Sequence, residues 1–289
     1  MTGDRTPALS RSTVDRDAAA REDSAILAAA WDGARVLVVE DGRALVGDDA
    51  LSLVLLDAAD APEGERMYLG RDDEASYFAV SAALPRRLGA RPQGLREVGA
   101  LLGDRDAGLL THAVGLANWH AAHPHCARCG APTEMARGGA VRRCTQDGSE
   151  HFPRTDPAAI MLVTDGADRC VLGRQAIWPA GRYSTLAGFV EPGESAEQAV
   201  VREVAEETGL AVREVVYRGS QPWPFPASLM LGFRAVCDAD AVPHPRDGEL
   251  EDARWFDKDE LRERGGSTLL LPTPVSIAWR LITDWLDGV

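Results

Sequence analysis

Basic residues are scarce in this 289-residue sequence: 31 lysines and arginines stand against 45 aspartates and glutamates, a formal net charge of −14. This balance excludes a protein whose main task is to coat nucleic acid, because phosphate contacts depend on Lys and Arg. An enzyme that acts on a single nucleotide, or on one end of an RNA, needs only a local basic site and remains compatible with the charge.

Long hydrophobic runs are missing as well. No apolar segment approaches about 18 residues, so we expect no transmembrane helix. Residues 1–7 lack both the basic stretch and the apolar segment of a signal peptide. We therefore expect a cytoplasmic protein without a membrane partner.

Cysteine is also rare, and three of the five cysteines lie close together in the sequence. Such a cluster indicates a metal site in a reducing compartment rather than a disulfide framework. Cys126, Cys129 and Cys144 fit the paired knuckles that hold Zn²⁺, but Asp147 stands where a fourth cysteine would be. We expect a structural zinc with Asp147 or His151 as its fourth ligand; the alternative is a metal-free ribbon held by packing.

The most informative stretch covers residues 188–210 and predicts a strand, a glycine-containing loop and a helix. Ser195 with Gln198 three residues later forms a capping-box signature for the start of the helix. Gly209 stands where a helix would end in a left-handed residue.

Three glutamates of this helix, Glu203, Glu206 and Glu207, are spaced to share one face. Placing like charges together costs a few tenths of a kcal/mol per pair, which favours a bound cation. Oxygen ligands suit Mg²⁺ or Mn²⁺. A solvated acidic face is the alternative, and the in-register Glu194 and Arg202 argue against it.

The whole pattern resembles the Nudix box: Gly188, five residues, Glu194, seven residues, and then Arg-Glu-apolar-X-Glu-Glu-X-Gly-apolar over residues 202–210. The resemblance implies a hydrolase of nucleoside diphosphates linked to another group, with an α/β/α sandwich fold. It also implies a set of metal ligands: Glu203, Glu207 and the backbone carbonyl of Ala187. An acidic residue before the strand that contains Trp255 is a further implied ligand or base, and we assign it to Glu249, with Glu251 and Asp252 as alternatives.

The rest of the chain indicates an α+β protein in four parts. We expect a flexible tail over residues 1–22, a β-rich N-terminal domain with linking helices over 23–122, a zinc-ribbon-like segment over 123–157 and the Nudix domain over 158–289. Short β-rich runs, among them 35–40, 51–56 and 76–81, suggest a small antiparallel domain at the N-terminus. Helices are expected at 24–31, 107–120 and 274–286.

A proline-rich segment over residues 220–228 places Trp223 and Phe225 on a stiff support, because three prolines lock it extended. Aromatic faces of this kind suit a base or a nicotinamide ring, although a loop that plugs the core would look similar. Its spacing, Ser-Gln-Pro-Trp-Pro-Phe-Pro-X-Ser, resembles the bacterial NADH pyrophosphatases, the subfamily of NAD-capped RNA hydrolases, as do the cysteine ribbon and the β-rich N-terminal part.

That resemblance implies a substrate site with Phe152 and Phe189 sandwiching the nicotinamide. The remaining implied substrate contacts are Arg96, Gln221, Pro222, Trp223, Pro224, Phe225, Pro226, Ala227, Ser228 and Ala278. It further implies a homodimer with a partly shared active site. The main departure from the family pattern is Asp147 in place of a zinc cysteine.

We therefore expect metal-dependent hydrolysis of NADH or NAD⁺ to NMN(H) and AMP, and removal of the NAD cap from RNA 5′ ends. The expected catalytic residues are Glu203, Glu206, Glu207 and Glu249, with Glu206 or Glu249 as the base. Two alternatives stay open: a Nudix hydrolase for another substrate such as ADP-ribose, and a Nudix-like regulator that binds nucleotides without cleaving them.

Overall fold

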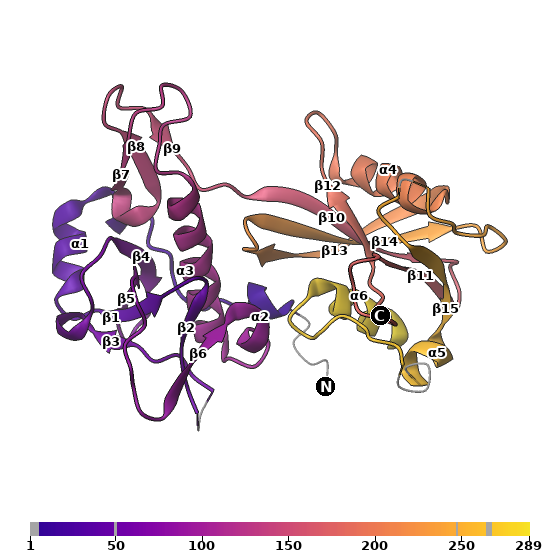
Figure 1. Cartoon of the computed structure of the whole chain (residues 1–289), viewed down its shortest axis with the longest axis horizontal. Helices are drawn as coiled ribbons and strands as arrows, with labels where there is room; N and C mark the ends of the chain where they lie inside the picture. The colour runs from indigo at the N-terminus through magenta and orange to yellow at the C-terminus, as the bar shows by residue number, and fades with distance from the viewer. Residues whose placement is uncertain (1–5, 49–50, 247, 264–267) are drawn as a thin grey trace. The chain divides into compact units, whose positions relative to one another are not determined.

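The computed structural model describes residues 6–48, 51–246, 248–263 and 268–289. Its chain forms two compact units (Figure 1), and each is described by itself. The C-terminal unit contains Asp156–Gln221 and Ser228–Val289, together with residues 6–8. The N-terminal unit contains Leu9–Thr155 and the short segment Pro222–Ala227.

A mixed six-stranded sheet forms the centre of the C-terminal unit, in the order β13-β14-β10-β11-β15, with β12 also paired to β10. The strands are β10 (Asp156–Thr164), β11 (Arg169–Arg174), β12 (Leu186–Phe189), β13 (Val212–Trp223), β14 (Ser228–Cys237) and β15 (Asp252–Asp257). Strand β10 is parallel to β14 and antiparallel to β11 and β12. Strands β10 and β11 form a hairpin.

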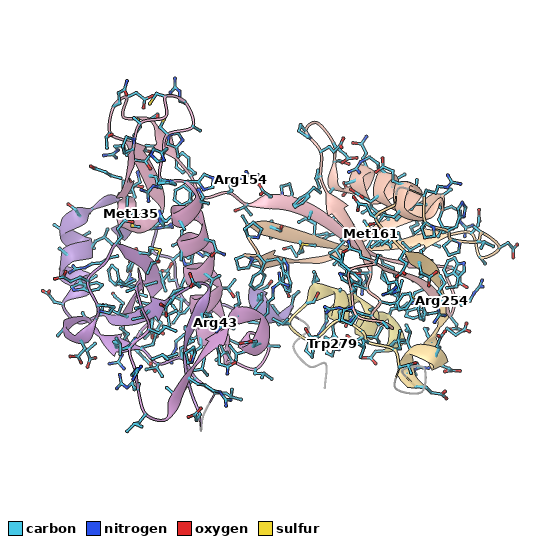
Figure 2. The ribbon with its side chains drawn as sticks, in the orientation of Figure 1. Arg43, Met135, Arg154, Met161, Arg254 and Trp279 are labelled. Atoms are coloured by element: carbon cyan, nitrogen blue, oxygen red, sulfur yellow. The ribbon has the colours of Figure 1, made fainter. Side chains whose placement is uncertain are left out.

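Successive residues of β10 point to opposite faces of the sheet, and each face has its own core. Met161, labelled in Figure 2, packs with Val200 and Val204 of α4 (Ala196–Thr208). Ile160 packs on the other face with Leu281 of α6 (Ile277–Leu286). Helix α5 (Lys258–Glu263) adds Leu261 to this second core. The two helical layers on opposite faces (Figure 1) confirm the expected α/β/α sandwich.

The N-terminal unit is built on a four-stranded sheet in the order β3-β1-β5-β4 and a two-stranded pair, β2 with β6. These strands are β1 (Arg35–Val39), β2 (Arg43–Gly47), β3 (Leu56–Asp57), β4 (Arg66–Arg71), β5 (Ser76–Ser81) and β6 (Ala90–Gly94). The helices are α1 (Ser24–Trp31), α2 (Leu95–Val98) and α3 (Asp104–Ala122), with 3-10 turns η1 (Ala8–Ser10), η2 (Ala20–Glu22) and η3 (Ala58–Asp60). The expected helix at residues 24–31 is confirmed, and α3 extends beyond the expected one at both ends.

Two details of this β-rich part were predicted wrongly. Strands β1 and β5 pair in parallel, so the sheet is mixed rather than antiparallel. The expected strand at 51–56 is reduced to a bridge at Leu53 and the first residue of β3; residues 49 and 50 lie outside the described part of the chain. The Leu53 amide instead donates to the buried carboxylate of Asp106 on α3 at 2.8 Å, a tertiary contact that local propensity does not reveal.

A small three-stranded ribbon completes the N-terminal unit, with β7 (Thr133–Ala136), β8 (Val141–Cys144) and β9 (Glu150–His151) paired in antiparallel order. The turn η4 (Arg137–Gly139) joins β7 to β8. Buried Arg142 connects the ribbon to α3, because its Nη1 lies 3.1 Å from Nδ1 of His120.

None of the helices that the structure describes has the length and apolar character needed to cross a membrane.

Candidate active site and metal centres

Helix α4 begins and ends where the sequence predicts. The Ser195 hydroxyl accepts the Gln198 amide at 3.2 Å, while the Gln198 side chain accepts the Ser195 amide at 2.9 Å. At the other end Gly209 takes a left-handed conformation with φ of 72°, and its amide donates a hydrogen bond to the Ala205 carbonyl. The reciprocal cap satisfies two amides that a helix start otherwise leaves unpaired.

Arg202 organises the charged face of this helix. Its guanidinium binds both carboxylate oxygens of Glu194 at 2.9 Å, and its Nη1 donates to Glu203 at 2.8 Å and to Glu206 at 3.0 Å. Its Nη2 also donates to the carbonyl of Phe189 at 2.9 Å. The hydrogen bonds to Glu194, followed by those to the helix glutamates, raise the pKa of Arg202, so the cation is permanent.

Glu203 lies directly against the backbone of β12. A Cβ on Gly188 would stand 1.8 Å from Oε1 of Glu203, so only glycine leaves room for this carboxylate. The Glu203 side chain is 13% exposed, and burial raises its pKa despite Arg202. The negative charges of Glu206 and Glu249 act in the same direction, which places Glu249 close enough to interact with this cluster.

The three helix glutamates differ in environment. Glu207 is 3% exposed and Glu203 is largely covered, whereas the Glu206 side chain is 53% exposed and paired with Arg202. Partly buried carboxylates with excess negative charge need a counter-cation, and oxygen donors suit Mg²⁺ or Mn²⁺. The residues present therefore fit the divalent metal that the Nudix resemblance implies.

The proline-rich segment is the tip of the β13–β14 hairpin rather than an extended crossing loop, and residues 224–227 form a turn. The rings of Trp223 and Phe225 meet edge to face at 4.9 Å. The Arg96 guanidinium lies 4.2 Å from the Phe225 ring centre and 5.2 Å from that of Trp223. The structure thus brings together predicted substrate residues from two separate stretches of sequence, Arg96 from one and Trp223 with Phe225 from the other.

The other predicted substrate residues have varied surroundings. Gln221 and Ala278 are buried, and the Gln221 amide donates to the carbonyl of Val275 at 3.0 Å. Phe152 and Phe189 are 61% and 60% exposed, each on the surface of its own unit. The remaining tip residues range from buried Pro224 to exposed Pro226, with Pro222, Ala227 and Ser228 half-buried.

The cysteine cluster of the ribbon gathers as predicted. The ligand atoms of Cys126, Cys129, Cys144 and Asp147 all lie within 4.8 Å of one another. Hydrogen bonds from Ser149 lower the pKa of Asp147 to about 2 and keep it ionised. All five cysteines belong to the described residues and are free thiols, and Cys170 and Cys237 are buried. Three thiols and a carboxylate are a donor set that suits Zn²⁺.

Two contributors to the site were missed by sequence reasoning. Asn118 on α3 donates its side-chain amide to the Pro224 carbonyl at 2.9 Å, a contact across 106 residues that no local pattern signals. The close approach of Gly188 to Glu203 was equally hidden. A glycine at a fixed position of a strand pattern is the only available hint of such an approach.

Three family models match this chain in the order that the structure shows. They are the NADH pyrophosphatase-like rudimentary NUDIX domain over residues 24–119, the NADH pyrophosphatase zinc ribbon domain over 121–152 and the NUDIX domain over 154–272. Together with the sandwich and its glutamate cluster they define the class, a metal-dependent hydrolase. The cofactors of this class are Mg²⁺ or Mn²⁺ at the hydrolytic site and zinc in the ribbon.

Full-length relatives narrow the class further. Proteins named NAD-capped RNA hydrolase NudC from Mycobacterium bovis and Mycobacterium tuberculosis are 44% identical, over 96% of this chain and 94% of theirs. The protein of that name from Deinococcus radiodurans is 38% identical over 86% of this chain and 91% of its own. The chain therefore belongs to the NADH pyrophosphatase family of Nudix hydrolases, which confirms the predicted resemblance.

Proposed function

We propose that this protein hydrolyses the diphosphate of NADH and NAD⁺ to NMN(H) and AMP, and that it removes the NAD cap from RNA 5′ ends. The observation that carries the proposal is the cluster of Glu203 and Glu206 beside β12, both bound by Arg202, with the charge of Glu249 acting on Glu203. The names of the relatives support the nicotinamide dinucleotide and the capped RNA as substrates.

In this proposal Glu203, Glu207, Glu249 and the Ala187 carbonyl hold Mg²⁺ or Mn²⁺. A metal held there would supply charge neutralisation of the diphosphate and a lowered pKa of water. Glu206 or Glu249 accepts the proton of the attacking water. Arg202 keeps the loop carboxylate and the helix carboxylates in fixed positions, so that the site is organised before substrate arrives.

Aromatic residues supply the proposed specificity. Phe152 and Phe189 stack on the nicotinamide, while Arg96 and the segment Gln221–Ser228 contact the rest of the dinucleotide, with the Ala278 backbone as a further contact. Stacking on a flat ring is worth about 1–3 kcal/mol per base and tolerates different ring chemistries. The same pocket therefore accepts a free dinucleotide or one joined to RNA.

The test is product analysis with NADH and a short NAD-capped RNA in Mg²⁺ or Mn²⁺. We expect NMN(H) with AMP from the first and a 5′-monophosphate RNA from the second. Glu207→Gln should lower kcat by several orders of magnitude, whereas Glu197→Gln, exposed on the same helix, should retain it. A preference for ADP-ribose over NADH would contradict nicotinamide stacking by Phe152 and Phe189. Tight nucleotide binding without turnover would indicate a Nudix-like regulator instead.

Assembly, location and domain boundaries are part of the same proposal. We infer a cytoplasmic homodimer with a partly shared active site, supported by the free thiols and by the family resemblance. The proposed parts remain residues 1–22, 23–122, 123–157 and 158–289. Light scattering of the purified protein tests the dimer, and limited proteolysis tests the boundaries; a monomer at all concentrations contradicts the first.

A further inference from the structure

The ribbon offers three thiols as metal ligands, and either Asp147 or His151 could supply the fourth ligand. Cys129 Sγ and Cys144 Sγ are 3.5 Å apart. Ligands at about 2.3 Å from a tetrahedral zinc lie roughly 3.8 Å from each other, so these two thiols are already near their bound spacing. The fourth position therefore decides what kind of zinc site this chain makes.

Asp147 is held in place for that position. Its Oδ1 accepts both the amide of Ser149 at 2.9 Å and the hydroxyl of Ser149 at 2.6 Å. The same carboxylate lies against the Cys144 thiol, and its ligand atom is within 4.8 Å of all three sulfurs. A carboxylate fixed by its neighbours loses little conformational entropy when it binds a metal.

His151 has a different position. Its Nε2 is 3.2 Å from Cys126 Sγ and 3.4 Å from Ser149 Oγ, both hydrogen-bond distances. It does not belong to the group of four ligand atoms that lie within 4.8 Å of one another. A ring nitrogen that touches a single ligand sulfur is suited to donate a hydrogen bond to it, as outer partners of metal sites do.

We propose that Zn²⁺ is bound by Cys126, Cys129, Cys144 and the carboxylate of Asp147, with Ser149 and His151 as hydrogen-bonding partners of the ligands. One hard oxygen thus replaces the fourth thiolate of a four-cysteine ribbon. Because Zn²⁺ binds thiolates strongly, this site should release zinc to a chelator faster than a four-cysteine version would.

X-ray absorption of the zinc-loaded full-length protein tests the proposal directly. We expect three sulfur ligands and one oxygen in wild type, four sulfurs in Asp147→Cys, and an unchanged wild-type shell in His151→Gln. With Co²⁺ as a probe, Asp147→Cys should gain sulfur-to-metal charge-transfer absorption by about one third, in proportion to thiolate number. Imidazole scattering that disappears in His151→Gln would overturn the assignment.

Zinc release gives a second readout. Competition with a colorimetric chelator should show at least tenfold faster release from Asp147→Ala than from wild type, and slower release from Asp147→Cys. His151→Gln should lie within about threefold of wild type, since it removes only a hydrogen bond. Equal release rates from wild type and Asp147→Ala would exclude Asp147 as a ligand even if the shell contained an oxygen, because water would then supply it.

A second inference rests on a separate contact in the N-terminal unit. Helix α3 holds the hairpin tip through Asn118, whose amide donates to the Pro224 carbonyl at 2.9 Å. One turn earlier, a Cβ on Gly115 would lie 3.7 Å from Pro224, so the helix surface there packs on the same proline. Proline offers no backbone N–H, so its carbonyl is the group by which the main chain can be anchored.

The geometry points to Asn118 as a positioning residue for Trp223 and Phe225, which flank Pro224. This inference rests on the proposed contact of the tip with the dinucleotide. Loss of the Asn118 anchor should weaken substrate binding more than the chemical step, because the metal-binding glutamates belong to the other unit.

Steady-state kinetics of Asn118→Ala and of the isosteric Asn118→Asp test it with NADH as substrate. We expect KM to rise five- to twentyfold in both, with kcat within threefold and a similar Tm. A fall in Tm with unchanged KM would show a merely structural role and overturn the inference. Trp223→Ala distinguishes failure of this inference from failure of the proposed function. If its KM is unchanged while wild type hydrolyses NADH, the hairpin tip does not contact substrate, but the proposed hydrolysis stands.

Discussion

Arg202 grips Glu194 through both carboxylate oxygens, with Nε to Oε1 and Nη2 to Oε2 each at 2.9 Å. Glu194 Oε2 also accepts the amide of Glu191 at 3.0 Å, so the pair fastens the loop before α4 to the helix itself. A planar guanidinium matches a carboxylate in this two-pronged way, and a lysine ammonium cannot. The pair therefore sets the position of the loop and, through the same cation, that of Glu203.

Replacing the guanidinium of Arg202 by the ammonium group of lysine should disorganise the site without unfolding the protein. We predict that Arg202→Lys lowers kcat for NADH about 10²-fold with a small change in KM, because positioning rather than charge is lost. Kinetics with matched Tm measurements provide the check. Arg213→Lys, at an exposed surface pair with Asp238, is the control and should behave as wild type.

The contact between Gly188 and Glu203 predicts a separation of stability from function. In Gly188→Ala the three atoms nearest to the new methyl all belong to the end of the flexible Glu203 side chain, which can swing away. We expect the carboxylate to leave its place, Mn²⁺ affinity to fall at least tenfold and Tm to change little. Titration by electron paramagnetic resonance measures free Mn²⁺; Gly33→Ala, where added atoms meet open space, should bind normally. Normal Mn²⁺ binding by Gly188→Ala would contradict the assignment of Glu203.

The glutamates of the cluster should differ in importance. Glu206 is exposed and already hydrogen-bonded to Arg202, whereas Glu249 interacts with Glu203 from outside the helix. We predict that Glu249→Gln lowers kcat more than Glu206→Gln does, by at least tenfold. Single-turnover rates at saturating Mg²⁺ distinguish a chemical defect from weak metal binding. The reverse order would assign the base to Glu206.

Buried His120 makes the N-terminal unit sensitive to acid. Burial, together with the positive charge of Arg142, lowers its pKa to about 4, while its Nε2 lies 2.8 Å from the Gly139 carbonyl. In the unfolded chain His120 takes up a proton near pH 6.5, whereas in the folded chain it does so only at about pH 4. The free energy of unfolding therefore falls as the pH drops through that window, by at most about 1.4 kcal/mol per pH unit.

Denaturant unfolding between pH 7 and pH 4 should show this dependence as a falling midpoint. His120→Gln keeps an amide donor for the Gly139 carbonyl but has no proton to gain, so its midpoint should fall less steeply over the same range. Because zinc ligands also titrate in acid, the two proteins are compared with the same zinc content. Parallel curves for both would show that another group controls the acid sensitivity.

Residues near one another in the chain carried the correct predictions. The Ser195–Gln198 cap, the left-handed Gly209 and the spacing of Glu203 with Glu207 are all set within one or two helical turns. The cysteine knuckle is equally local. Such signals survive in a bare sequence because the interacting groups are held at fixed separations by the backbone.

The remaining features of the fold and the site depend on tertiary packing. No pattern in the sequence pairs β1 with β5 in parallel, joins Asn118 to Pro224 across 106 residues, or sets Glu203 against Gly188. Local sequence patterns are enough to identify the groups that can bind metal and the helix, α4, that carries them. Tertiary structure sets which glutamates are buried, which of them bond to Arg202 and what anchors the aromatic tip, because burial and long-range hydrogen bonds depend on segments that are far apart in the sequence.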